Sequence, residues 1–142
     1  MIVLDTTILS YAVGSEHPLR DPCRWLLVAH GDGLVQAATT IEVLQEFTHV
    51  RARRRSREDA VALAREYASA LVVLATRIED LDLGLTLFQR YPGLGAFDAM
   101  LAAVALNRQA RALVSADRTF GTVAGPRWID PTTPALDRLL AK

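Results

Sequence analysis

The feature that most constrains the fold is a series of short apolar runs that alternate with longer helical stretches. The runs are continuously apolar, as at residues 1–4 and 71–74, and polar residues bound them. Strands of this kind are buried on both faces, which is typical of parallel sheets covered by helices. The pattern predicts an α/β fold with three α/β/α layers and a central parallel sheet of four to five strands.

Turn residues and periodicity place the individual elements. We expect strands at residues 1–4, 34–37, 71–74, 113–115 and 127–129. Helices are expected at about residues 8–13, 18–30, 40–50, 57–70, 78–89, 96–107 and 136–140. The chain has 142 residues and shows no repeat or linker, so residues 1–142 are expected to form one domain.

Composition narrows the cellular setting. No apolar run reaches the roughly 18 residues that span a bilayer. The apolar N-terminal segment carries Asp5 and lacks the basic leader of a secretory signal. The single cysteine, Cys23, cannot form an internal disulfide. We therefore expect a cytoplasmic protein with no membrane partner.

Single acidic residues fall close to the predicted strands. Asp5 follows the first strand, Asp117 lies two residues after the fourth, and Glu42 falls in the helical turn after the second. Ligands of an open parallel sheet gather beyond the carboxyl ends of its strands, so these acids should share one edge. Asp98 begins an otherwise apolar helix, where burying an unpaired carboxylate is costly.

Each acid also has an ordinary structural interpretation. Asp5 could cap the helix after it, and Asp117 could hold a turn or cap a short helix. Glu42 fits a capping box that begins at Thr39, and Asp98 could complement the dipole of its own helix. The recurrence of four acids at the same structural place favours a shared site over unrelated caps.

Clustered carboxylates indicate a metal ion. They cannot all stay ionised without a cation, since like charges at close range raise each other's pKa. Oxygen ligands select hard ions, with Mg²⁺ or Mn²⁺ usual where phosphates are handled. Such ions activate water and neutralise charge on a phosphodiester. The acids therefore predict a nuclease that depends on magnesium, for which manganese should substitute.

The ordered acidic motifs resemble those of the PIN-domain family, and specifically of the VapC toxins of bacterial and archaeal toxin–antitoxin pairs. The motifs are residues 1–9, 39–44, 95–103 and 113–120, and each contains one of the acids. The resemblance runs from residue 1 to about residue 130 and covers motif order, spacing and chain length. It implies a PIN-like nuclease domain with the three-layer fold predicted above.

The resemblance also implies an activity and partners. The chain would be a magnesium-dependent endoribonuclease, the toxin of a VapBC-type pair, which cleaves cellular RNA by metal-activated water. Its partners would be a cognate VapB-like antitoxin and a second copy of the chain, as a homodimer or a larger toxin–antitoxin assembly. The catalytic acids would be Asp5, Glu42, Asp98 and Asp117, with Asp5 and Asp98 as the direct metal ligands.

Three further residues are expected to support these acids. Thr7 stands where the family often has Asn or Ser, and its hydroxyl can orient a metal-bound water. Ser115 belongs to the fourth motif. Glu46 shares a helix face with Glu42, and it could be the second acid, a supporting group or the partner of an antitoxin arginine. Glu42 is preferred as the second acid because it lies nearer the predicted sheet edge.

Five arginines gather in residues 51–57 although the net charge is zero. They could form a solvated turn between helices, with helix-end arginines complementing a dipole. They could equally form a groove that follows the RNA backbone. The RNA-binding candidates are Arg51, Arg53, Arg54 and Arg55. Tyr11, Trp25 and Phe47 could stack on bases but are expected to lie in the core.

Two other functions compete with this interpretation. A phosphatase of the haloacid dehalogenase type would need a second Asp two positions after the first, where Thr7 stands. A catalytically silent PIN-like module would bind RNA or a partner without cutting, although the presence of all the acids argues against it. DNA also stays open as a substrate.

Overall fold

A sheet of five parallel strands, in the order β3–β2–β1–β4–β5, forms the centre of the structure. The computed structural model describes residues 1–141. The strands are β1 (Ile2–Leu4), β2 (Ala37–Thr40), β3 (Val72–Leu74), β4 (Ala112–Val114) and β5 (Trp128–Ile129). In β1, Ile2 pairs with Ala37 on one side and with Ala112 on the other. The predicted parallel sheet is confirmed.

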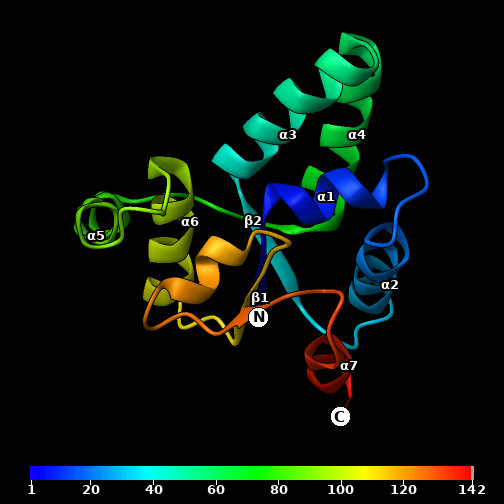
Figure 1. Cartoon of the computed structure of the whole chain (residues 1–142). Coiled ribbons are helices and arrows are strands. Elements are labelled where there is room, and N and C mark those ends of the chain that lie inside the picture. The colour runs from blue at the N-terminus through cyan, green and yellow to red at the C-terminus, as the bar shows by residue number, and fades with distance from the viewer. Residues whose placement is uncertain (142) are drawn as a thin grey trace.

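Helices cover both faces of this sheet. They are α1 (Thr6–Ala12), α2 (Arg20–Gly31), α3 (Ile41–Arg54), α4 (Arg57–Ala70), α5 (Ile78–Arg90), α6 (Ala96–Asn107), the 3₁₀ helix η1 (Arg118–Thr122) and α7 (Pro134–Leu140). Figure 1 shows α5 and α6 on one side of the sheet and α1 and α2 on the other. The three-layer prediction is therefore confirmed. No helix within residues 1–141 is long and apolar enough to cross a membrane.

The second strand begins three residues later than predicted, at Ala37 and not at residue 34. Leu34 is 45% exposed and belongs to the turn after α2. Two threonines extend the strand because their hydroxyls are satisfied: Thr39 Oγ1 donates to the carbonyl of Leu4 at 3.0 Å, and Thr40 Oγ1 accepts from the amide of Val43 at 3.2 Å. Thr40 thus ends β2 and caps α3.

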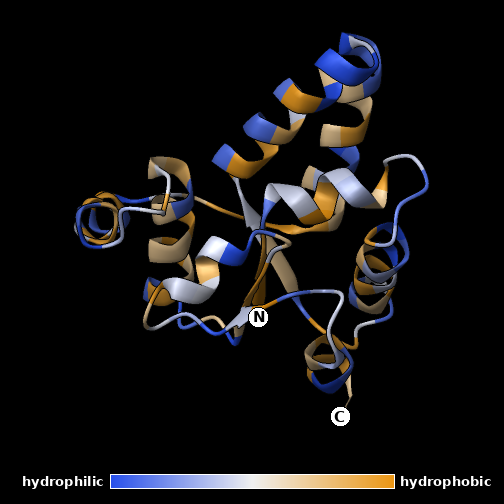
Figure 2. Cartoon of the chain, in the orientation of Figure 1, coloured by the Kyte–Doolittle hydropathy of each residue, from blue (hydrophilic) through white to orange (hydrophobic). Residues whose placement is uncertain are grey.

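Helices α3 and α4 form an antiparallel hairpin beside the sheet. Figure 2 shows that the tip of this hairpin is strongly hydrophilic, whereas the strands between the two helical layers are apolar. Ser56 caps α4 by accepting a hydrogen bond from the amide of Asp59 at 3.1 Å. The hairpin therefore carries its polar residues away from the core.

Helices α5 and α6 pack closely because Gly84 has no side chain at their contact. A Cβ at Gly84 would lie 3.3 Å from Met100 Cα, which is tighter than ordinary packing allows. Half of the residues of α6, Ala99 and those from Leu101 to Ala105, are buried. This packing fixes the position of the first turn of α6, which carries Asp98.

A buried ion pair joins the start of α5 to the end of α6. Asp80 is fully buried, and Arg108 donates to both of its carboxylate oxygens at 2.9 Å. The amide side chain of Asn107 and the backbone N–H of Arg77 complete the set at 2.8 Å each. Although burial raises the pKa of Asp80, these hydrogen bonds and the Arg108 charge hold it below its ordinary value.

Asp80→Ala should lower the free energy of unfolding by about 3–5 kcal/mol, because it leaves Arg108 without its buried partner. Urea unfolding at neutral pH measures this change. Asp82→Ala removes an exposed acid from the same helix and should have little effect. Equal losses in the two variants would contradict the role given to the buried pair.

Candidate functional site

Asp5 leaves the carboxyl end of β1 and is only 5% exposed. Its Oδ2 accepts hydrogen bonds from Ser115 Oγ at 2.7 Å and from Thr7 Oγ1 at 3.0 Å. Ser115 follows β4, whose register sets Val114 opposite Leu4. Asp5 occupies the N-cap position of α1, but its side chain makes no capping hydrogen bond. Its carboxylate is therefore held by two hydroxyls, one of them from Thr7 in the first turn of α1, and not by a capping bond to a helix amide.

A cavity of about 250 Å³ lies beyond this edge of the sheet. Four acids from four different segments line it: Asp5, Glu46, Asp98 and Asp117. The adjacent wall comes from α1, including Thr6, Thr7 and Ser10. Parallel strands thus bring acids that are far apart in sequence to one place, as the topology predicts.

Asp98 experiences the strongest electrostatic effect in the cavity. Burial raises its pKa to about 7, with further contributions from the negative charges of Asp5, Asp117 and Glu46. Like charges at close range disfavour ionisation in this way. The shift means that, without a cation, Asp98 is only partly ionised near neutral pH.

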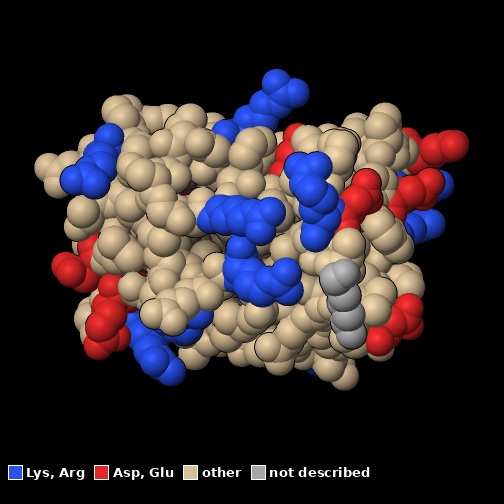
Figure 3. All heavy atoms as spheres, turned by 90° about the horizontal axis from the view of Figure 1, so that it is seen from below, with Lys and Arg blue, Asp and Glu red and all other residues tan. Residues whose placement is uncertain are grey.

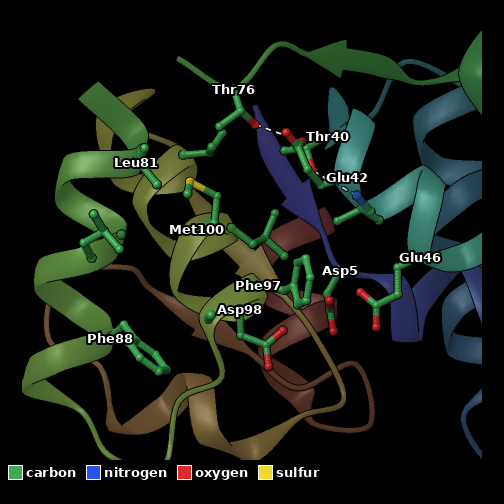
Figure 4. Close-up of a pocket in the computed structure, with 16 residues that line it drawn as sticks. Asp5, Thr40, Glu42, Glu46, Thr76, Leu81, Phe88, Phe97, Asp98 and Met100 are labelled. Carbon is green, nitrogen blue, oxygen red and sulfur yellow. Dashed lines mark hydrogen bonds between the residues drawn. The ribbon is translucent and has the colours of Figure 1, made fainter. Parts of the chain in front are cut away.

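Helix α3 directs its two glutamates to different places. Glu46 lines the acid cavity, and its Oε2 accepts from Thr6 Oγ1 at 2.9 Å. Glu42 Oε2 instead accepts from Thr76 Oγ1, in the loop after β3, at 2.8 Å. In Figure 4 the carboxylate of Glu46 lies beside Asp5, whereas Glu42 extends toward Thr76.

This placement departs from the preference for Glu42 as the second acid. Glu42 does lie nearer the start of α3, but there it stands above β2 and β3. The cavity lies over β1 and β4, and one further helical turn is needed to bring a side chain to it. Glu46 therefore lines this cavity with the three aspartates, whereas Glu42 lines only the adjoining groove, which Asp5, Glu46 and Asp98 also border.

Asp117 serves two purposes. Its Oδ1 accepts from the amide of Thr119 at 2.9 Å and from Thr119 Oγ1 at 2.8 Å, so it caps η1. The same carboxylate lines the acid cavity. The structural and the functional interpretation of this residue are therefore compatible.

The donor set of the cavity suits a hard divalent cation. Its acidic side chains are four carboxylates, and burial, with repulsion from the other three, disfavours the ionised form of Asp98. Within residues 1–141, no three acidic, histidine or cysteine side chains converge closely enough to enclose an ion together. Such an arrangement fits Mg²⁺ held by one or two carboxylates, because this ion usually keeps several waters.

The arginine cluster does not act as one surface. Arg51 donates to Asp59 at 2.6 Å and to the carbonyl of Val13 at 3.1 Å, so it joins α3 to α4 and to the end of α1. Its guanidinium is thus engaged within the protein, and its contact with RNA stays a prediction. Arg53 lines an outer groove of the hairpin, whereas Arg54 lines the acid cavity.

Arg55 has a third environment. Together with Arg51, its positive charge lowers the pKa of Asp59, after the larger effect of the Arg51 hydrogen bond. Arg55 therefore lies toward α4 rather than toward the acids. Helix periodicity separates Arg51, Arg53 and Arg54, because successive residues of α3 point in different directions, and Arg55 follows the end of that helix.

The aromatic candidates also separate. Phe47 is fully buried, as predicted, but Trp25 is 46% exposed and the prediction for it is wrong. Tyr11 lines the acid cavity. Phe97, which the sequence motifs do not single out, is 80% exposed beside Asp98. The sequence feature that could have identified Phe97 is its position in the first turn of α6, next to Asp98.

An apolar groove of about 260 Å³ adjoins the acid cavity. It is bordered by α5 and α6 on one side and by the end of β2 and the start of α3 on the other. In Figure 4, Phe97 lies near the acids, and Leu81 and Phe88 lie on α5. The uncovered apolar residues of this region are Leu81, Leu85, Phe88 and Phe97. In α5 they recur at spacings of four and three, so that helix has an apolar stripe outside the core.

Comparison with known proteins agrees with this geometry. Residues 2–126 match the family model of the PIN domain. Ribonuclease VapC7 of Mycobacterium tuberculosis is 49% identical, over 99% of this chain and 98% of that protein. Ribonuclease VapC23 of the same species is 34% identical, over 86% of this chain and 97% of that protein.

Solved structures share the fold. M. tuberculosis VapC20, described as a Sarcin-Ricin loop cleaving toxin, superimposes with a TM-score of 0.75 at 16% identity, covering 88% of this chain and 96% of that one. VapBC2 from Rickettsia felis, bound to a DNA fragment from its promoter, gives a TM-score of 0.74 at 19% identity, covering 91% and 98%.

A parallel sheet with carboxylates gathered beyond its central strands defines an α/β protein with an acidic pocket at the carboxyl edge. The chain belongs to the PIN-domain family, and its full-length relatives are VapC proteins.

Asp98→Asn should stabilise the metal-free protein at alkaline pH. Because folding raises the Asp98 pKa from 3.8 to about 7, wild-type stability falls as pH rises across that interval. The variant lacks this loss and should gain about 1–3 kcal/mol at pH 8 and less at pH 5, with one pKa unit worth about 1.4 kcal/mol. Urea unfolding in EDTA measures both values. A gain independent of pH would contradict the assignment.

Proposed function

We propose that this chain is a magnesium-dependent endoribonuclease and the toxin of a VapBC-type toxin–antitoxin pair. The observation that carries the proposal is the cavity in which Asp5, Glu46, Asp98 and Asp117 face one another. The full-length similarity to a protein named ribonuclease VapC7 supports the activity. The substrate we propose is single-stranded or looped RNA, because its phosphodiester must reach acids at the edge of a sheet.

The residues of the cavity divide the work of holding a metal ion. Asp5 and Asp98 are the proposed direct ligands. Hydrogen bonds hold Asp5 in one orientation, and the raised pKa of Asp98 means that a nearby cation would stabilise its ionised form. Glu46 and Asp117 would act as the supporting acids, accepting hydrogen bonds from water bound to the ion. When bound, Mg²⁺ supplies an activated water and neutralises charge on the phosphodiester. We expect Mn²⁺ to substitute.

Two hydroxyls keep the first ligand in place. Ser115 and Thr7 both donate to Oδ2 of Asp5, and the amide of Ala116 donates to Thr7 Oγ1 at 3.1 Å. Such contacts orient a ligand before the ion arrives, and their loss usually weakens metal sites. Thr7 thus acts on the orientation of Asp5 as well as on nearby water.

A VapB-like antitoxin is the proposed partner. Several structures with the same fold are VapBC toxin–antitoxin complexes, among them VapBC-1 from nontypeable Haemophilus influenzae. The groove beside the acid cavity leaves Leu85, Phe88 and Phe97 about half exposed or more. An uncovered apolar patch of this kind typically marks a protein interface. A segment seated there would also cover the entrance to the acids.

Cleavage of single-stranded RNA with Mg²⁺ tests the activity, and excess EDTA should abolish it. Asp5→Asn and Asp117→Asn should each lower kcat by about 100-fold or more, because even groups that support ligands contribute about 10- to 100-fold. Asp32→Asn, an exposed acid outside the cavity, is the matched control. Thermal unfolding confirms that each variant is folded.

Two outcomes would overturn the proposal. Full activity in EDTA would exclude the metal. Retention of RNA without any product, in wild type supplied with Mg²⁺ or Mn²⁺, would indicate a silent binding module. A parallel DNA substrate distinguishes ribonuclease from deoxyribonuclease activity.

A further inference from the structure

One positive side chain shares the cavity with the acids. Among the lysines and arginines within residues 1–141, Arg54 alone lines it. Arg54 ends α3 and follows Glu46 and Val50 at successive spacings of four, so the three share one helix face. Two helical turns, about 12 Å along the axis, separate the backbone of Glu46 from that of Arg54.

Arg54 is not neutralised by the acids that it accompanies. The ion pairs of the described chain join Arg20 to Asp21, Arg51 to Asp59 and Arg108 to Asp80. Arg54 is exposed at the rim of the cavity and forms none within 4.0 Å among residues 1–141. Its guanidinium therefore remains available to a ligand that also reaches the carboxylates.

The neighbouring arginines do not share this position. Arg51 is engaged by Asp59, Arg53 lines the outer groove of the hairpin and Arg55 lies toward Asp59. Figure 3 shows other basic side chains gathered on the face seen from below, on the side of the molecule where the N-terminus lies. Asp5 stands at the opposite end of β1. That basic face is thus remote from the acids.

We infer that Arg54 binds the phosphate next to the scissile phosphodiester of single-stranded RNA. The inference rests on the proposed ribonuclease function and assigns a specific contact within it. A guanidinium presents two parallel donors that match phosphate oxygens. Because Arg54 does not contact the acids, it meets a flanking phosphate while the scissile one lies over Asp5 and Asp98. It thereby sets the path of the strand across α3.

The competing role is that of a counter-ion. Arg54 would then only temper the repulsion between the acids, and its loss would change how tightly they bind a divalent ion. A phosphate contact predicts instead that metal affinity stays the same and that RNA affinity falls. The two roles are separated by measuring both affinities in one variant.

Arg54→Gln and its matched control Arg55→Gln remove the same charge at adjacent exposed positions. Arg54→Gln should raise KM for a short single-stranded RNA about ten-fold with little change in kcat, since a charged hydrogen bond is worth about one such factor. The slope of log Kd against log salt should fall by about 0.7. Arg55→Gln should change KM much less, and Mn²⁺ affinity should be the same in both variants.

Fluorescence anisotropy with the same RNA measures Kd without any turnover. If wild type cleaves nothing but Arg54→Gln still weakens RNA binding, the proposed activity fails and the contact stands. An unchanged Kd, an equal loss in Arg55→Gln, or altered Mn²⁺ affinity in Arg54→Gln would each overturn the inference.

Discussion

Burial of carboxylates beside one another at the carboxyl edge of the sheet is the constraint on which the arrangement of this protein depends. Asp5 is fixed at the end of the most central strand, and the other acids approach it from α3, α6 and the segment after β4. Burial raises the pKa of Asp98, and the negative charges of Asp5, Asp117 and Glu46 raise it further. Ionising Asp98 in the folded protein therefore costs free energy.

The helical pair α5–α6 contains two aspartates with opposite electrostatic environments. Asp80 is fully buried but satisfied by Arg108, Asn107 and a backbone amide, and its pKa lies below the ordinary value. Burial and the neighbouring acids raise the pKa of Asp98 above it. One carboxylate therefore anchors the helix pair, whereas the other has no compensating positive partner among the causes of its pKa shift.

Much of the fold follows from sequence pattern. Continuous apolar runs identified the buried parallel strands, and the turn after each strand located Asp5 and Asp117. The start of β2 was misplaced because Thr39 and Thr40 are polar, and only tertiary hydrogen bonds make them suitable for a buried strand. Local pattern does not contain those partners.

The same limitation affected the site. Glu42 and Glu46 share a helix face, and the sequence does not determine how α3 is rotated about its axis relative to β1. Thr76 and Thr6, which hold the two carboxylates apart, come from loops far away in the chain. The arginines are clustered in the sequence but have different environments in the structure. Arg51 donates a hydrogen bond to Asp59, whereas Arg54 lines the acid cavity. The exposure of Phe97 likewise depends on the tertiary packing around the start of α6, which local sequence does not contain.

The central claim is that Glu46 completes a divalent-metal site with the three aspartates. Calorimetric titration of Mn²⁺ into wild type, Glu46→Gln and Glu42→Gln tests it most directly. The account predicts that Glu46→Gln weakens Mn²⁺ binding by about ten-fold or more, as expected for a group that supports the ligands, and that Glu42→Gln leaves it unchanged. The opposite ranking, or affinity unaffected by either change, would contradict it.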